Sequence, residues 1–197
     1  MRDRDIRFAM KEDLLCSHRQ DLSCRIIDEL DVCLGVSRID IALINGSISG
    51  YEIKSERDTL VRLPSQLDSY AKVFDYLTLV ASHRHLKKVE DLLPDWCGLI
   101  AVEPSPHQSV KFNLVRESRR NTKIEPYSIA QFLWKDEILQ ILNTIGYSKR
   151  VGSKPKPYLW KLLTEELDVD SLRYYVRESL KCRTGWRVDL PLIPSDD

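Results

Sequence analysis

Two carboxylates and one amine stand in stretches of sequence that are mostly apolar. Asp40 lies within residues 37–44, and Glu52 and Lys54 lie within residues 51–55. Charged groups in such surroundings are costly unless they are paired or bound to a cation. A hard divalent cation on the carboxylates could polarise a phosphoryl oxygen and acidify a bound water. The amine could orient that water or neutralise developing charge, so this set suits phosphodiester hydrolysis.

Glu52 and Lys54 are predicted to share one face of a strand. Residues 37–44 are apolar and β-branched and are followed by Asn45-Gly46, which predicts a hairpin that returns as a second strand over residues 48–55. Side chains alternate along a strand, so Ile53 should point the other way, into the core.

The register of this hairpin decides whether Asp40 joins Glu52. A two-residue turn gives paired residue numbers that sum to 91 and places Asp40 opposite Tyr51. A three-residue loop gives 92 and places Asp40 opposite Glu52. We therefore predict an odd loop or a bulge, with Gly46 able to supply a residue in the left-handed region.

A helix is predicted to follow, because apolar residues recur at helical spacing between residues 60 and 74. Asp58 or Thr59 could cap it. Pro64 requires that the helix begin near Leu63. The same helix carries Gln66 and Tyr70, four residues apart.

Asp40 followed by Glu52-Ile53-Lys54 resembles the D…ExK signature of the PD-(D/E)XK nuclease superfamily, and Gln66 to Tyr70 is similar to the QxxxY motif of its RecB-like branch. The resemblance covers roughly residues 5–115 and is closest to a poorly characterised group of small bacterial and phage nuclease-like proteins. It implies a restriction-endonuclease-like mixed β-sheet flanked by helices. It also implies Mg²⁺ or Mn²⁺ on Asp40 and Glu52, a catalytic Lys54, and Gln66 and Tyr70 supporting the site or contacting nucleic acid. Ile39 stands where the signature has proline.

A further acid often accompanies this signature. Glu29 is the first choice, because it lies just upstream of the hairpin among apolar residues, and Glu12 in the first helix is the alternative.

The order of the remaining elements predicts an α/β domain followed by a helical module. The opening residues 6–14 predict a helix, whereas residues 25–33 fit either a strand or a helix. Further strands are expected at 76–81, 97–102 and 110–115, the last at an edge, with a helix at 86–93. Helices are expected at 129–145, 159–167 and 171–182. We therefore divide the chain into a nuclease-like domain, 1–125, and a C-terminal all-helical module, 126–197.

Basic residues are unevenly distributed along a chain of formal net charge zero. Residues 116–161 contain ten Lys or Arg and four Asp or Glu. This separation suits a protein that binds phosphates at some distance from its acidic residues. The predicted nucleic-acid contacts are Arg57, Arg62, Lys154 and Lys156. A stripe of Arg173, Arg177 and Lys181 fits phosphate binding and a solvated helix face equally well.

Five scattered cysteines without a CxxC pair argue against a disulfide scaffold and a zinc site. The charged N-terminus lacks a signal sequence, and no apolar run approaches ~20 residues, so we expect a cytoplasmic protein without membrane association. The predicted function is a metal-dependent nuclease that cuts DNA rather than RNA, with a homodimer as one arrangement for cutting both strands. The alternative is a non-catalytic module that binds nucleic acid or protein on a nuclease fold.

Overall fold

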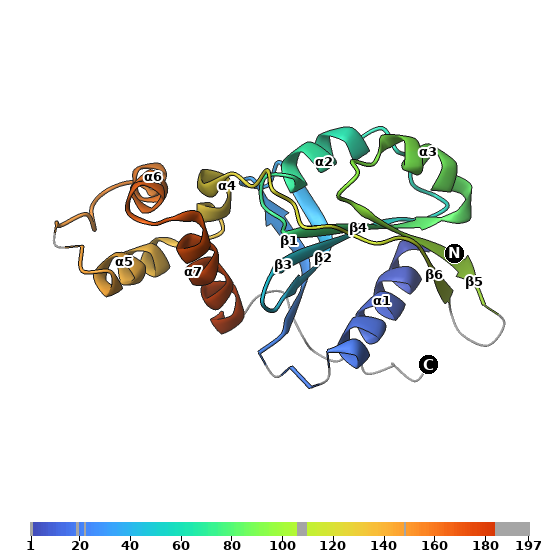
Figure 1. Ribbon diagram of the computed structural model, residues 1–197, viewed down its shortest axis with the longest axis horizontal. Coiled ribbons are helices and arrows are strands. Elements are labelled where there is room, and N and C mark those ends of the chain that lie inside the picture. Colours follow the sequence, from blue (N-terminus) through green and yellow to red (C-terminus); the bar gives the residue numbers. More distant parts are fainter. Residues whose placement is uncertain (1, 19, 22, 106–109, 148, 184–197) are drawn as a thin grey trace, which may run out of the picture.

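A single mixed sheet carries helices on both faces in the computed structural model, which describes residues 2–18, 20–21, 23–105, 110–147 and 149–183 (Figure 1). The strands follow one another across the sheet in chain order. They are β1 (Arg25–Val32), β2 (Ser37–Ile44), β3 (Ile48–Lys54), β4 (Tyr76–Ser82), β5 (Gly98–Pro104) and β6 (Val110–Arg116). Strands β3, β4 and β5 are parallel, and the other neighbours are antiparallel. The predicted mixed sheet is confirmed, and residues 25–32 form a strand.

Helix α1 (Asp3–Ser17) covers one face of the sheet, and the other helices lie on the opposite face or beyond β1 (Figure 1). They are α2 (Leu63–Tyr70), the 3₁₀ turn η1 (His83–His85), α3 (Leu86–Leu92), α4 (Pro126–Ala130), α5 (Lys135–Thr144), α6 (Lys156–Glu166) and α7 (Val169–Cys182). The predicted flanking helices are confirmed, and the helices predicted at 159–167 and 171–182 form as α6 and α7. Within the described residues, no helix has the length and apolar composition needed to cross a membrane.

Two apolar cores lie on the two faces of the sheet. The smaller core joins Ile6, Met10 and Leu14 of α1 to apolar side chains of all six strands. The larger core joins the other face of the sheet to α2, α3 and all four C-terminal helices. Leu172 and Val176 of α7 are fully buried in it. The C-terminal helices and the sheet therefore bury their apolar surfaces together.

The single helix predicted at 129–145 is wrong, because the chain forms α4 and α5 with a break between them. The backbone nitrogen of Trp134 donates to Glu137 Oε2 at 2.6 Å, so Glu137 caps a new helix at this point. Arg183 donates to Glu137 Oε1 at 2.6 Å and also to the carbonyl of Phe132 inside the break. These polar contacts replace the hydrogen bonds that a continuous helix would make.

Helix α2 begins at Leu63, as Pro64 requires, but neither predicted cap serves it. Arg62 occupies the N-cap position. The side chain of Asp58 instead accepts hydrogen bonds from the backbone nitrogen and hydroxyl of Ser55, at 2.7 and 2.6 Å. Asp58 thereby closes the turn directly after β3 and fixes the chain where the ExK strand ends.

Candidate functional site

The β2–β3 hairpin has the register that the chemistry requires. Ile41 pairs with Tyr51, so paired residue numbers sum to 92 and the predicted odd loop is confirmed. The proposed role of Gly46 is wrong, since this glycine does not have a positive φ. The loop is instead held by Asn45 Oδ1, which accepts from the backbone nitrogen of Ser47 at 2.9 Å.

Asp40 lies where β2 and β3 separate. The paired ladder ends at Ile41 and Tyr51, one position before Asp40 and Glu52 would face each other. Beyond it, the backbone nitrogen of Ile53 donates to Asp40 Oδ2 at 2.7 Å. The carboxylate thus takes the place of a backbone acceptor, which keeps it beside Glu52.

A matching irregularity in β1 and β2 opens the sheet at this position. Leu30 pairs with Ile39, so Glu29 stands opposite Asp40, and Glu29 has a φ of 52°. Ile39 and Ala42 are three residues apart, so in a regular strand they would point to opposite faces. Both belong to the same core, which shows that the alternation of side chains is broken between them. A left-handed residue inside a strand costs ~1–3 kcal/mol, and such strain clusters at functional sites.

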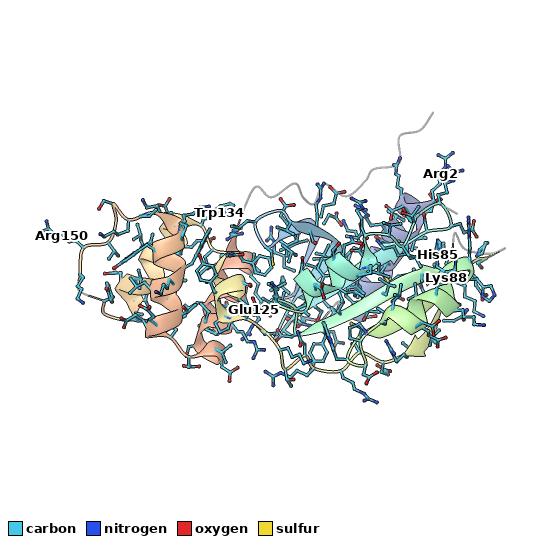
Figure 2. The ribbon with its side chains drawn as sticks, turned by 90° about the horizontal axis from the view of Figure 1, so that it is seen from above. Arg2, His85, Lys88, Glu125, Trp134 and Arg150 are labelled. Atoms are coloured by element: carbon cyan, nitrogen blue, oxygen red, sulfur yellow. The ribbon has the colours of Figure 1, made fainter. Side chains whose placement is uncertain are left out.

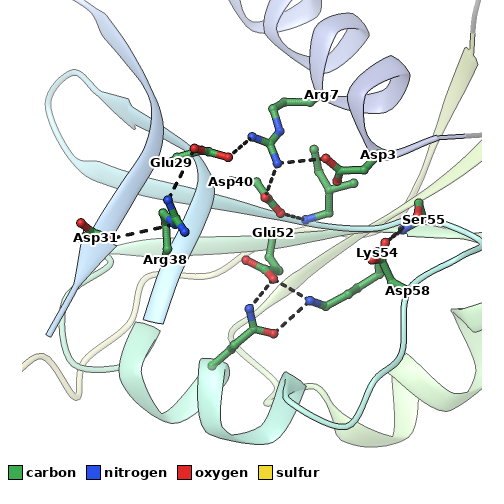
Figure 3. Close-up of polar contacts among 12 residues, drawn as sticks. Asp3, Arg7, Glu29, Asp31, Arg38, Asp40, Glu52, Lys54, Ser55 and Asp58 are labelled. Atoms are coloured by element: carbon green, nitrogen blue, oxygen red, sulfur yellow. Dashed lines mark hydrogen bonds and ion pairs between the residues drawn. The ribbon is translucent and has the colours of Figure 1, made fainter. Parts of the chain in front are cut away.

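Glu52 is held by three donors on the α2 side of the sheet, and Figure 3 shows one of them, Lys54. Lys54 Nζ and Gln66 Nε2 each donate to Glu52 Oε1 at 2.7 Å, and the hydroxyl of Tyr70 lies 2.7 Å from Oε2. Lys54 Nζ also donates to Gln66 Oε1 at 2.9 Å. Ile53 packs in the core beneath α1, so the predicted division of faces is confirmed. The four polar side chains form one closed network.

Burial and the nearby carboxylate of Glu52 raise the pKa of Asp40 to about 7. Two contacts oppose this rise, namely the hydrogen bond from Ile53 and an ion pair of 2.7 Å with Arg7. Desolvation disfavours the ionised form, and a second negative charge adds to that cost. The donors to Asp40 therefore do not offset the cost of burying its charge near Glu52.

Arg7 of α1 is the part of this site that the sequence did not reveal. Its guanidinium donates to Asp40 Oδ1 at 2.7 Å, to Asp3 Oδ2 at 2.9 Å and to Glu29 Oε1 at 2.9 Å (Figure 3). In the sequence, the one sign of these contacts is the i,i+4 spacing of Asp3 and Arg7, and such pairs are common on helix surfaces. Arg38 of β2 extends the network through Glu29, at 3.6 Å.

The structure separates the two candidates for an additional acid. Glu29 is joined to Asp40 through Arg7, and its side chain is 42% exposed. Glu12 lies elsewhere on α1, where it lines a surface hollow with Phe112 of β6. Glu29 is thus the acid that the fold brings to the site.

The predicted nucleic-acid contacts are exposed and fall into two groups. Arg57 and Arg62 follow β3 in the segment that leads to α2, next to the candidate centre. Lys154 and Lys156 belong to the helical module, where each ammonium group lies 5.3 Å from an aromatic ring centroid, that of Tyr158 or Trp160. Only the first pair is adjacent in sequence to the site residues.

Asp40 and Glu52 fit a hard divalent cation by their chemistry. In the described part of the chain, no group of three or more His, Cys, Asp or Glu side chains is arranged to hold a metal. Mg²⁺ keeps several waters and requires only one or two carboxylates from the protein. The raised pKa of Asp40 is the signature of an under-compensated buried carboxylate, which a cation would relieve.

Comparisons with known proteins point to one family. The model of the family described as bacteriophage P4 protein cII matches residues 2–189. Protein cII of Enterobacteria phage P4 is 26% identical over 183 residues, which cover 93% of this chain and 68% of that protein. A solved protein of unknown function from Silicibacter pomeroyi is similar over 57% of this chain and 68% of its own, with a TM-score of 0.40 and 20% identity.

Proposed function

The chain belongs to the bacteriophage P4 protein cII family, and we propose that this member is a metal-dependent nuclease of the PD-(D/E)XK type that hydrolyses DNA. One observation carries the proposal. Asp40 lies where two strands separate, Lys54 donates to the nearby Glu52, and burial together with Glu52 raises the pKa of Asp40 to about 7. Two carboxylates and an amine in this geometry match what phosphodiester hydrolysis requires.

Asp40 and Glu52 would hold Mg²⁺ or Mn²⁺, which supplies positive charge to phosphoryl oxygens and acidifies a bound water. Gln66 and Tyr70 fix the orientation of Glu52 through hydrogen bonds of 2.7 Å. The ammonium group of Lys54 has three donors, and two are used by Glu52 and Gln66. The third donor is available to orient the attacking water or to stabilise charge on the phosphate.

The substrate would extend from this centre over basic side chains. Arg57 and Arg62 are exposed directly after the ExK strand and would contact phosphates beside the scissile bond. Lys154 and Lys156 would contact the nucleic acid farther away, on the helical module. Phosphate contacts of this kind provide affinity without sequence preference.

A non-catalytic binding module is the second candidate, and one observation favours it. The oxygens of both carboxylates already accept hydrogen bonds from protein donors, Asp40 from Arg7 and Ile53, and Glu52 from the α2 network. A cation must compete with these contacts. A chain that had lost catalysis would keep the charges paired in this way.

Cleavage assays separate the two candidates. Single-stranded, duplex and branched DNA, and RNA for comparison, are incubated with Mg²⁺ or Mn²⁺ and either wild type, Asp40→Ala, Lys54→Ala or the isosteric Glu52→Gln. Each variant is expected to lose about 10²-fold or more in rate, because a preorganised charge at the reacting centre is removed. Asp31→Ala is the matched control, since this carboxylate is 70% exposed and lies 3.9 Å from Arg38 at the edge of the network.

Metal-dependent cutting that is retained in the control and lost in the three site variants supports the nuclease. Absence of cutting by the wild type, with DNA still retarded in a gel shift, would favour the binding module. Cutting that survives all three substitutions would show that Asp40, Glu52 and Lys54 are not the catalytic centre.

A further inference from the structure

The basic stripe of α7 does not form one solvated face. Arg173 is only 9% exposed, and Lys181 is partly buried. Arg173 and Arg177 instead line a surface pocket of about 400 Å³ together with Arg120. The remaining walls are Asp75, Tyr76, Asp170 and the β2–β3 turn at Gly46 and Ser47.

Arg173 forms ion pairs with the two aspartates of this pocket. Its Nη2 lies 3.3 Å from Asp75 Oδ1, and its Nη1 donates to Asp170 Oδ1 at 3.1 Å. Its Nε is buried and has no hydrogen-bond partner. Arg120 and Arg177 have no ion pair within the part of the chain that the structure describes. Three arginines against two aspartates leave the pocket positively charged.

Arg120 is held in place by the residues on either side of it. The backbone nitrogen of Arg119 donates to the carbonyl of Trp96, and that of Asn121 to the carbonyl of Asp75, each at 2.8 Å. The side chain of Asn121, which is 2% exposed, donates to the carbonyl of Phe74 at 3.0 Å. The backbone of this segment is therefore fixed before a ligand arrives, which lowers the entropic cost of binding.

The pocket lies at the start of β3, and the candidate centre lies near the end of the same strand. Ser47, in its wall, precedes Glu52 by five residues, which corresponds to ~17 Å of extended strand. A nucleic-acid strand covers this distance in ~5 nucleotides, at ~3.4 Å for each. A chain bound at the candidate centre can thus reach the pocket with a phosphate several nucleotides away.

We propose that Arg120, Arg173 and Arg177 form a phosphate-binding site that takes a backbone phosphate of the nucleic acid bound at Asp40 and Glu52. The proposal rests on the proposed function for the identity of its ligand. Guanidinium groups suit phosphate because their N–H donors match two of its oxygens at once. Asp75 and Asp170 orient Arg173, and Arg120 and Arg177 supply the uncompensated charge.

The test compares two double variants that remove the same charge. Arg120→Ala/Arg177→Ala removes the two arginines without an ion pair and leaves buried Arg173 intact. Lys87→Ala/Lys88→Ala is the control, because both lysines are exposed on α3, and Figure 2 shows Lys88 at the end of the molecule away from the helical module. Binding of a fluorescein-labelled 20-base-pair duplex is measured by anisotropy in EDTA, where metal-dependent cutting cannot occur, at several salt concentrations.

The arginine variant is expected to bind the duplex about 10-fold more weakly, and the slope of log K against log salt should fall by about 1. The control should match wild type, and Arg120→Lys/Arg177→Lys should recover part of the loss. Equal binding by the wild type and the arginine variant, or an equal loss in both double variants, would overturn the proposal.

Inorganic phosphate distinguishes the source of the ligand. If the wild type fails to bind the duplex but phosphate raises its Tm, and the arginine variant shows no such rise, the pocket takes free phosphate and the nucleic-acid assignment is overturned. If the wild type binds the duplex through these arginines yet cuts nothing with Mg²⁺ or Mn²⁺, the site stands and the nuclease proposal fails.

Discussion

Raising the pH is expected to destabilise the metal-free protein through Asp40. Burial and Glu52 raise the pKa of this side chain from 3.8 to about 7 in the folded state, whereas the unfolded chain keeps the ordinary value. Below pH ~4 the group is protonated in both states and has no effect. Between pH ~4 and ~7 only the folded state holds the proton, so stability falls as the pH rises. Above pH ~7 the loss is complete.

The two pKa values set the size of this effect. One pKa unit corresponds to ~1.4 kcal/mol, so a pKa of about 7 against 3.8 amounts to ~4 kcal/mol. The side chain of Asp40 is 19% exposed and its ion pair with Arg7 can tighten on ionisation, so we expect a loss of ~2–4 kcal/mol. At its steepest, the fall of the free energy of unfolding with pH should approach the value for one proton, ~1.4 kcal/mol per pH unit.

Urea unfolding at half-unit intervals from pH 4.5 to 8, in EDTA, measures this slope. Asp40→Asn is the control, because it removes the titration, although its amide nitrogen must face one of the two donors and lowers stability at every pH. The readout is therefore the slope, which should be smaller in the variant by about one proton. Parallel curves for wild type and variant would refute the reasoning. If Asp40 is a ligand, Mn²⁺ in place of EDTA should shift the pH range over which the wild type loses stability to lower pH.

Two substitutions test other buried contacts. Tyr70→Phe removes a hydroxyl that lies 2.7 Å from Glu52 Oε2. Urea unfolding should show a stability loss of ~1.5–3 kcal/mol, the usual range for a hydrogen bond to a charged group. A loss below ~0.5 kcal/mol would contradict this contact. Arg173→Met leaves the buried carboxylate of Asp75 without its cation and should cost ~3–5 kcal/mol. Adding Asp75→Asn should restore part of that stability, and a double-mutant cycle with no coupling would argue against the ion pair.

The hairpin register could be predicted because two independent constraints agree. Side chains alternate with a period of two, so only an odd loop brings Asp40 to Glu52. Isolated charges on apolar strands are costly, which favours the register that brings them together. Both constraints act within fifteen residues of sequence, so no knowledge of the tertiary structure was needed.

Arg7 and the left-handed Glu29 could not be predicted, because their roles depend on contacts between distant segments. Arg7 precedes Asp40 by 33 residues and reaches it only after α1 packs across the sheet. The φ of 52° at Glu29 is unfavourable locally and persists only because the paired strands on either side hold it. The break before α5 has the same origin, since Arg183 stabilises it from a distant part of the chain.

The C-terminal helices are joined to the sheet by shared apolar packing and by polar contacts. Their apolar residues complete the larger core, and Arg173 ties α7 to Asp75 just before β4. Arg25 of β1 adds a hydrogen bond of 3.1 Å from Nη1 to the carbonyl of Lys181. Removing residues 126–197 would therefore expose the core of the sheet and take away two of the three pocket arginines. This shared packing holds the arginine pocket at a fixed distance from Asp40 and Glu52, as the proposed phosphate-binding site requires.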